Sequence, residues 1–175
     1  EKKDLELKML QAQINPHFLY NTLDSIKWVA TIQKNSGIVQ TVTSLSSLLK
    51  NMAKGFNEKV TLQQELDFLN DYVIIEKVRY VEMFDIDIQV DSPELYQAQI
   101  IKLTLQPLVE NAIFNGIEPS GRMGIIQIHA WAENSVLKVS VRDNGIGMSE
   151  EQCRKILTDT ARVTRSTMSG IGLPN

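Results

Sequence analysis

The sequence of 175 residues predicts an α+β fold, in which an N-terminal helical hairpin precedes a region of strands and further helices. Apolar residues recur every three or four positions through the first 52 residues, which is typical of amphipathic helices. Three later segments, 84–90, 124–132 and 135–141, alternate apolar and polar residues as strands do. Helical patterns at 62–82 and 101–116 precede the first and second of these segments, and an apolar content of 43% allows a packed core.

Residues 1–33 have the pattern of one long helix with an apolar seam. The members of the seam alternate between spacings of four and three residues: Leu5, Met9, Ala12, Pro16, Leu19, Leu23, Ile26 and Ala30. Asn35, Ser36 and Gly37 break the pattern, and a second amphipathic helix follows over 38–52. Two such helices enclose too little core to fold alone, so we expect two hairpins to pair into a dimeric four-helix bundle.

A histidine follows a proline inside the first helix. Proline within a helix removes a backbone hydrogen bond and costs ~3 kcal/mol, so a local kink that presents His17 is one use of Pro16. Asn21 lies one turn later on the same face of the helix. The alternative is a surface histidine without a function, and these residues alone leave both interpretations open.

A break at Gly55–Asn57 ends the hairpin and marks the expected boundary between a domain of residues 1–57 and one of residues 58–175. Thr61 and Gln64 form a capping box that opens the first helix of the second domain.

The predicted helix over 101–116 carries two asparagines one turn apart. Its inward-facing residues are expected to be Leu105, Leu108, Val109 and Ala112. Asn111 and Asn115 share a different face. Amides in such places are often only surface residues, and these two border a pocket only if the fold brings this helix over the strand that ends near Asp143.

The strands over 124–132 and 135–141 are predicted to form a hairpin that turns at Glu133 and Asn134. His129 falls on the mixed face of the first strand, with Gln127 and Trp131. We expect it to be a surface residue without a metal role.

The second strand of this hairpin leads into Asp143-Asn144-Gly145-Ile146-Gly147-Met148. Alternation places Asp143 on the apolar, inward-facing side, where a carboxylate is costly unless hydrogen-bond donors surround it. Gly145 and Gly147 remove side chains where the backbone approaches another group closely. These features are typical of the wall of a small-molecule pocket, and an ordinary turn with a solvated acid is the alternative.

The remaining residues are predicted to form a short helix and a loop. The helix begins with Ser149 as its N-cap and ends near Leu157. Residues 158–169 have no period and are expected to form a mobile loop that leads to Gly170 and Gly172.

Composition excludes several classes of protein. The net charge of −3, with scattered basic residues, argues against a nucleic-acid surface. The single cysteine, Cys153, indicates a reduced, intracellular setting. No apolar run approaches the roughly 20 residues of a membrane helix. We expect the chain to be an excised piece of a longer protein, with the second domain incomplete at its C-terminus.

Four motifs in order resemble those of the YesM/LytS-type sensor histidine kinases. Residues 11–23 resemble the phospho-acceptor box, residues 105–112 the N box, residues 143–148 the first glycine box and residues 170–173 the second. The resemblance implies a dimeric helical domain joined to a Bergerat-type ATP-binding domain of the gyrase and Hsp90 kind, with a mixed sheet layered against helices. No Walker-type glycine motif occurs in the sequence.

The resemblance also implies a nucleotide site. Asp143 would accept a hydrogen bond from the adenine amino group, and Asn111 would ligate Mg²⁺ through its amide oxygen, with Asn115 nearby. The nucleotide wall would be shaped by Gly145 and Gly147.

The loop over 158–169 would close over ATP. At its end, Gly170 and Gly172 would let backbone amides reach the phosphates.

The implied reaction is attack of His17 on the γ-phosphate, followed by transfer to an aspartate of a response regulator. Either Asn21 or Glu110 would orient the imidazole or take its proton. An N-terminal membrane sensor would lie outside the fragment, which would itself be cytoplasmic.

The sequence departs from the family pattern at three places. Phe18 follows the histidine where many histidine kinases have an acid, and strands expected after the second glycine box are missing. Phe114 and Asn115 stand where relatives often carry Lys and His; Arg162 or Arg165 would then replace that lysine as a phosphate contact. Two alternatives therefore stay open: a related ATPase that phosphorylates no histidine, and a degenerate kinase that serves as a dimeric scaffold.

Overall fold

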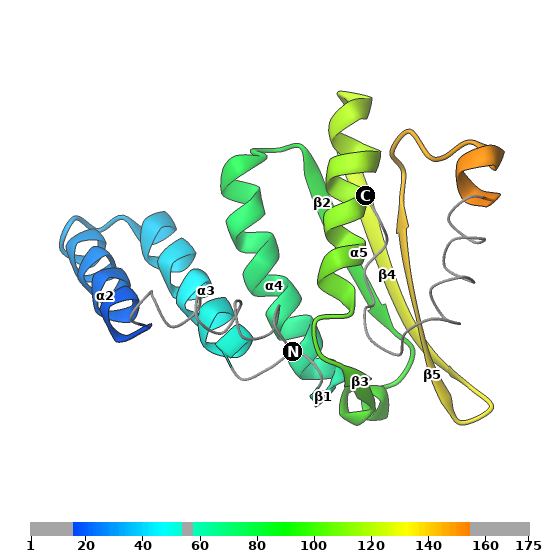
Figure 1. Cartoon of the computed structure of the whole chain (residues 1–175), viewed down its shortest axis with the longest axis horizontal. Coiled ribbons are helices and arrows are strands. Elements are labelled where there is room, and N and C mark those ends of the chain that lie inside the picture. The colour runs from blue at the N-terminus through cyan, green and yellow to red at the C-terminus, as the bar shows by residue number, and fades with distance from the viewer. Residues whose placement is uncertain (1–15, 54–57, 155–175) are drawn as a thin grey trace, which may run out of the picture.

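A computed structural model of the chain describes residues 16–53 and 58–154. Helices stand side by side and cover one face of a sheet (Figure 1). The larger helices are α2 (Pro16–Ile32), α3 (Ser36–Ala53), α4 (Leu62–Arg79) and α5 (Leu105–Asn111), the last continued by the π-helix η2 (Ala112–Ile117). Two short 3₁₀ helices, η1 (Pro93–Gln97) and η3 (Glu118–Ser120), connect larger elements. This arrangement confirms the predicted α+β fold.

The main sheet is mixed. Its strand order is β2 (Phe84–Val90), β4 (Gly124–Glu133) and β5 (Val136–Asp143). Strands β2 and β4 are parallel, whereas β4 and β5 form an antiparallel hairpin. Asn134 and Ser135 make its two-residue turn, and their φ angles of 51° and 63° are those of a type I′ turn. The hairpin was therefore predicted correctly, with the turn one residue later.

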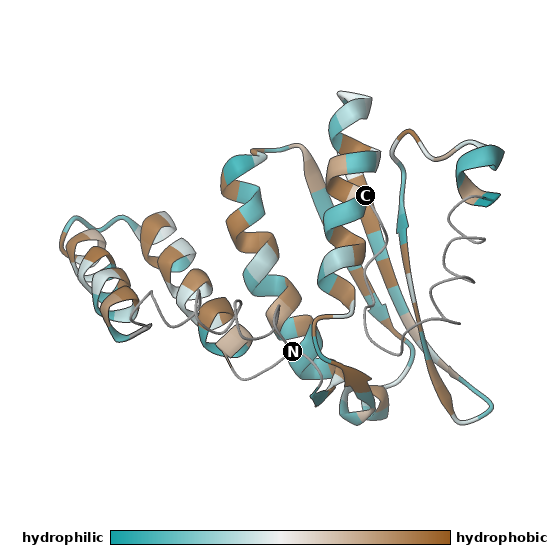
Figure 2. Cartoon of the chain, viewed as in Figure 1, coloured by the Kyte–Doolittle hydropathy of each residue, from teal (hydrophilic) through white to brown (hydrophobic). Residues whose placement is uncertain are grey.

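The core lies between this sheet and helices α4 and α5, and apolar residues line the facing surfaces in Figure 2. The largest side chains with less than 2% exposure come from both layers: Leu62, Leu69, Leu105, Val109, Ile113, Ile117, Ile126 and Ile128. The predicted capping box also forms at the start of α4. Thr61 accepts from the backbone N–H of Gln64, and the Gln64 side chain accepts from the backbone N–H of Thr61.

The prediction for residues 101–116 was partly wrong. Residues 99–101 form a strand, β3 (Gln99–Ile101), which pairs with β1 (Lys59–Thr61), so the helix begins only at Leu105. Leu103 has a φ of +58°, which ends any helical path before it. Leu108, expected in the core, is 38% exposed, because the buried positions follow the spacing of Leu105, Val109 and Ala112.

The helical hairpin leaves an apolar surface exposed. Leu23 and Ala30 of α2, and Val42 and Leu48 of α3, are buried. Five other apolar side chains of α2 are 44–69% exposed: Phe18, Ile26, Trp28, Val29 and Ile32. A surface of this kind supports the expectation that the hairpin needs a partner. Within residues 16–53 and 58–154, no helix has the length and apolarity to cross a membrane.

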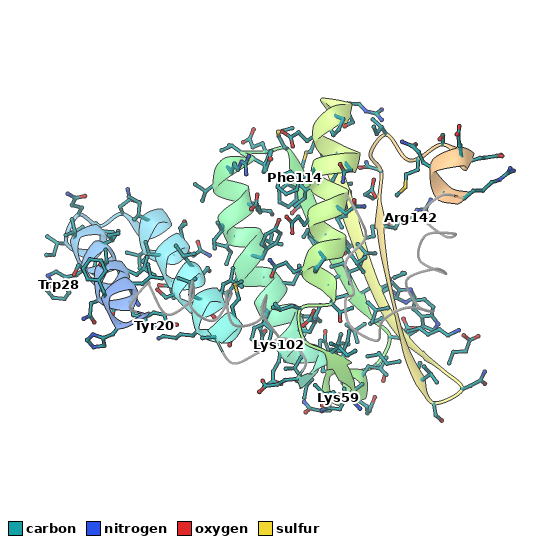
Figure 3. The ribbon with its side chains drawn as sticks, viewed as in Figure 1. Tyr20, Trp28, Lys59, Lys102, Phe114 and Arg142 are labelled. Atoms are coloured by element: carbon teal, nitrogen blue, oxygen red, sulfur yellow. The ribbon has the colours of Figure 1, made fainter. Side chains whose placement is uncertain are left out.

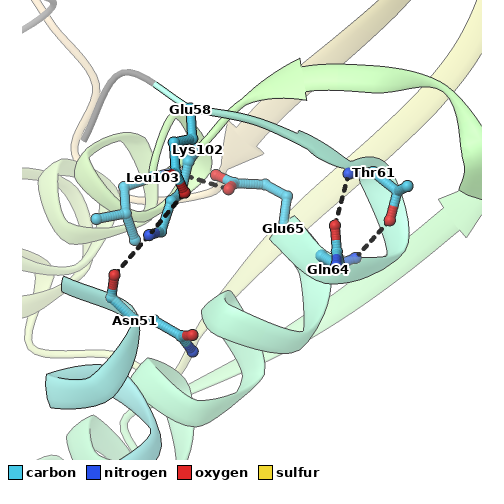
Figure 4. A network of polar contacts seen from close by, with 7 residues as sticks. All are labelled: Asn51, Glu58, Thr61, Gln64, Glu65, Lys102 and Leu103. Carbon is cyan, nitrogen blue, oxygen red and sulfur yellow. Dashed lines mark hydrogen bonds and ion pairs between the residues drawn. The ribbon is translucent and has the colours of Figure 1, made fainter. Parts of the chain in front are cut away.

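A buried polar network connects α3 with the start of α5 (Figure 4). The Lys102 side chain is 2% exposed, and its Nζ donates to the carbonyl oxygen of Asn51 at 2.5 Å. The carboxylate of Glu58 lies 4.0 Å from the same Nζ. Glu65 of α4 is 1% exposed and accepts the backbone N–H groups of Leu103 and Leu105, each at 2.8 Å. This network therefore holds the loop from which the asparagine-bearing helix begins. The expected boundary at Gly55–Asn57 lies outside the described residues.

Candidate nucleotide site

The asparagine-bearing helix lies directly against the glycine loop that follows β5. The carbonyl oxygen of Gly116 accepts the backbone N–H of Ile146 at 2.9 Å. A Cβ atom on Gly116 would lie 2.6 Å from Oδ1 of Asp143, and one on Gly145 would lie 2.2 Å from the Gly116 carbonyl carbon. Since neither approach tolerates a side chain, both glycines are required by the packing. The condition under which Asn111 borders a pocket is thus met.

Asp143 is half-buried at the end of β5, on the side that faces Gly116. Its Oδ1 accepts the backbone N–H of Gly145 at 2.9 Å. No donor among the described residues contacts its Oδ2, which leaves an acceptor for the amino group of a bound base. Gly147 has a φ of +71°, a left-handed conformation that favours glycine. These features fit a purine-binding wall.

Asn144 has a role that sequence reasoning missed. Its Oδ1 accepts the backbone N–H of Ile125 at 2.8 Å, so the glycine loop is tied to the start of β4. An asparagine directly after a strand and before glycine is a signal for such a side-chain contact to the backbone.

The two asparagines of the helix form a pair. The amide nitrogen of Asn115 donates to Oδ1 of Asn111 at 2.7 Å, which fixes the orientation of the half-buried Asn111 amide. An amide oxygen has two acceptor positions, so one remains for a hard cation. No cluster of three or more acidic, His or Cys side chains that could hold a metal occurs among the described residues. Mg²⁺ commonly uses few protein ligands together with substrate phosphates, and Asn111 fits that pattern.

Glu110 is exposed on α5 and influences a group of acidic side chains on α4. Burial raises the pKa of the Tyr72 hydroxyl, and the charges of Glu76 and Glu110 add to this effect. Burial also raises the pKa of Glu76; the Arg79 guanidinium opposes the shift and Glu110 adds to it. Among the described residues, the Tyr72 hydroxyl and Oε2 of Glu76 have no hydrogen-bond partner although they are buried.

His17 and Asn21 lie far from this site. His17 is exposed on α2, and the amide nitrogen of Asn21 lies 3.2 Å from its Nδ1. Helices α3 and α4 stand between α2 and α5 (Figure 1). The structure therefore brings Asn111, Asn115, Gly145 and Asp143 together but keeps the His17–Asn21 pair apart from them.

Several predicted features lie outside the described residues. They are the two glycines Gly170 and Gly172, the loop over 158–169 with its two arginines, and the seam before Pro16. The predicted start of the short helix is confirmed, because Ser149 and Gln152 form a second capping box. As expected for a surface residue, His129 contacts Asp91 and stacks on Trp131.

Comparison with known proteins divides the chain into two matched segments. Residues 5–84 match the histidine kinase family, and residues 100–175 match the family of histidine kinase-, DNA gyrase B- and HSP90-like ATPases. The second match implies binding of ATP. Both segments follow the order predicted from the four motifs.

Similar proteins are themselves sensor kinases. The chain is 41% identical over 174 residues to sensor histidine kinase YesM of Bacillus subtilis (strain 168), which is 99% of the chain and 28% of that relative. It is 34% identical over 155 residues to sensor protein kinase HptS of Staphylococcus aureus (strain USA300), which is 88% of the chain and 29% of that relative. The chain thus spans less than a third of these relatives. On the motifs, the fold and these matches together, the chain belongs to the YesM-type sensor histidine kinases.

Proposed function

We propose that the protein is an ATP-dependent histidine kinase, which phosphorylates its own His17 and passes the phosphoryl group to an aspartate of a response regulator. The observation that carries this proposal is the contact between the Asn111–Gly116 segment and the Asp143–Gly147 loop. The His17–Asn21 pair on α2 supplies a phospho-acceptor in the segment that matches the histidine kinase family.

The nucleotide-binding residues have separate roles in this proposal. Asp143 accepts the adenine amino group through Oδ2, while Oδ1 is held by Gly145. Asn111 offers the remaining acceptor position of Oδ1 to Mg²⁺, and Asn115 keeps that amide oriented. Mg²⁺, when bound, would neutralise charge on the phosphates during transfer. Gly147 shapes the wall.

The two glycines of the second box complete the proposed site. Gly170 and Gly172, outside the described residues, would offer backbone N–H groups to the phosphates.

The chemistry at His17 depends on its tautomer. In the proposed step a bond forms between Nε2 and the γ-phosphorus, the bond from that phosphorus to the ADP oxygen breaks, and the ring loses its proton. Attack through Nε2 requires the proton of the neutral ring on Nδ1. A half-turn of the Asn21 amide places its oxygen, rather than its nitrogen, 3.2 Å from Nδ1, where it accepts that proton's hydrogen bond. Glu110, next to Asn111, is the proposed proton acceptor.

The proposed assembly contains two domains per chain, residues 1–57 and 58–175, and two chains. The exposed apolar side chains of α2 supply a surface on which two hairpins would pair into a four-helix bundle. Because α3 and α4 separate α2 from α5, phosphorylation requires the ATP-binding part to reach His17 by rearrangement or to reach the partner's histidine. In this proposal the chain is the cytoplasmic part of a membrane sensor.

The test measures transfer of labelled γ-phosphate from Mg²⁺–ATP to the full-length protein, with His17→Gln and Asp143→Ala beside it. We expect acid-labile, alkali-stable label that disappears in both variants. His17→Gln should still bind ATP, whereas Asp143→Ala should not, since only the latter contacts the base. Addition of an isolated receiver domain should then discharge the label from the wild-type protein.

Each contrary result has a defined meaning. Label on His17→Gln would exclude His17 as the acceptor. ATP binding without any label would favour one of the two alternatives, and release of ADP would separate the ATPase from the degenerate scaffold.

A further inference from the structure

One arginine on α4 stands beside the nucleotide helix without a carboxylate partner. The Arg79 guanidinium carbon lies 5.1 Å from the ring centroid of Tyr80 and 5.7 Å from that of Phe114. The two rings are themselves in edge-on contact at 5.8 Å. The guanidinium makes no ion pair and no side-chain hydrogen bond with a described residue, and it is exposed. Its N–H donors are therefore available to a ligand.

Phe114 places this cation next to the proposed phosphate and metal contacts. It lies three residues after Asn111 and directly before Asn115, on the π-helix that carries both amides. Figure 3 shows Phe114 between α4 and the nucleotide helix. The aromatic pair also limits where the guanidinium can lie, because stacking on a ring favours a planar cation.

The other described cations of residues 58–154 are placed less well for this task. Lys77, Lys138 and Arg154 each pair with a carboxylate. Figure 3 shows Lys59 and Lys102 near the end of the helix opposite Phe114, and Lys102 is buried. The remaining two are Arg142, in the polar register of β5, and Arg122, in the turn before β4. Of the cations in this part of the chain, Arg79 is the one in contact with the nucleotide helix.

The local charge also calls for a cation. Glu76 and Glu110 influence each other and the Tyr72 hydroxyl, so this side of the helix is acidic. A polyphosphate brought next to Asn111 would meet these carboxylates, and like charges at short range repel. A guanidinium between them and the ligand offsets that repulsion and can contact two phosphate oxygens at once.

We propose that Arg79 binds the phosphate chain of ATP from the α4 side and so supplies a phosphate contact that the aromatic residue at position 114 does not. This inference rests on the proposed function, since it assumes an ATP site at Asn111 and Asp143. It differs from the sequence-based expectation, which assigned that contact to Arg162 or Arg165.

The test compares ATP dissociation constants of the wild-type protein, Arg79→Gln, Arg79→Lys and Arg122→Gln. Arg122 is an exposed arginine that follows the same helix, so its substitution is a control for loss of one positive charge. Charge-assisted hydrogen bonds predict that Arg79→Gln weakens ATP binding by about tenfold or more. Arg79→Lys should recover part of the loss, and Arg122→Gln should change little.

Salt distinguishes ligand contact from a structural role. If Arg79 contacts phosphate, the difference between wild type and Arg79→Gln should shrink as NaCl is raised from about 0.05 M to about 0.5 M. The unfolding midpoint of the nucleotide-free variant should match that of Arg122→Gln.

Two results would overturn the assignment: Arg79→Gln binding ATP as tightly as wild type, or a salt-independent loss accompanied by a lower unfolding midpoint. A wild-type protein that binds no ATP would instead refute the proposed function.

Discussion

Substitution of Glu65 tests whether the buried network at the start of α5 stabilises the nucleotide-binding part. Glu65 is 1% exposed, and its two oxygens accept the backbone N–H groups of Leu103 and Leu105 at 2.8 Å each. Leu103 holds a left-handed conformation, with a φ of +58°, that this contact supports. Loss of the carboxylate would leave two buried donors without an acceptor.

The expected destabilisation follows from those two contacts. A buried N–H left unsatisfied costs roughly 1–3 kcal/mol, so Glu65→Ala should lose about 4 kcal/mol of the free energy of unfolding. Glu65→Gln keeps one acceptor oxygen and turns an NH₂ group toward the other donor, so it should lose about 2 kcal/mol. Losses of this size are a large fraction of the ~5–15 kcal/mol that stabilises a typical domain.

The assay is urea unfolding followed by circular dichroism, with Asp67→Asn as the control. Asp67 is exposed on the same helix, so its substitution should stay within about 0.5 kcal/mol of wild type. A Glu65→Gln protein within that same range would refute the reasoning, because it would mean that the two backbone contacts add no net stability.

Three further predictions follow from other contacts. Gly116→Ala puts a Cβ 2.6 Å from Oδ1 of Asp143 and should weaken ATP binding at least tenfold (~1.4 kcal/mol); unchanged affinity in a titration would contradict this. Burial raises the pKa of Glu76 from its ordinary 4.5, so the stability contributed by its proton is full below that value and is lost as the pH rises through the raised pKa. Glu76→Gln should therefore be more stable than wild type at about pH 8 and equal to it near pH 4, and unfolding at both pH values checks this. Lys102→Met removes a donor to the Asn51 carbonyl and should speed amide exchange in the last turn of α3; unchanged exchange would show that the contact does not hold α3.

Local patterns predicted most of the elements. Strands β2, β4 and β5 bury one face, so their alternation marked them to within one or two residues. The capping box at Thr61 and the inward direction of Asp143 also depend on neighbouring residues, and both are confirmed.

The features that were missed depend on contacts between distant parts of the chain. The start of α5 is set by Glu65, about forty residues earlier, which captures Leu103 and Leu105 and forces the left-handed residue between strand and helix. Pairing of β3 with β1 likewise joins two three-residue strands that carry no period of their own. Arg79 looked like an ordinary basic residue at a helix end until the fold placed it over Phe114.

The π-helix between Asn111 and Gly116 makes the length of this segment as important as its composition. Its hydrogen bonds span five residues, one more than in an α-helix, so the segment contains one residue more per turn than regular winding would use. Loss of any single residue there would restore α-helical winding and rotate whatever follows by about 100° relative to what precedes. Gly116 would then turn away from Asp143 while Asn111 stayed in place, and the two halves of the nucleotide site would separate. Among homologous sequences, a one-residue gap in this box would therefore mark loss of nucleotide binding more reliably than a substitution within it.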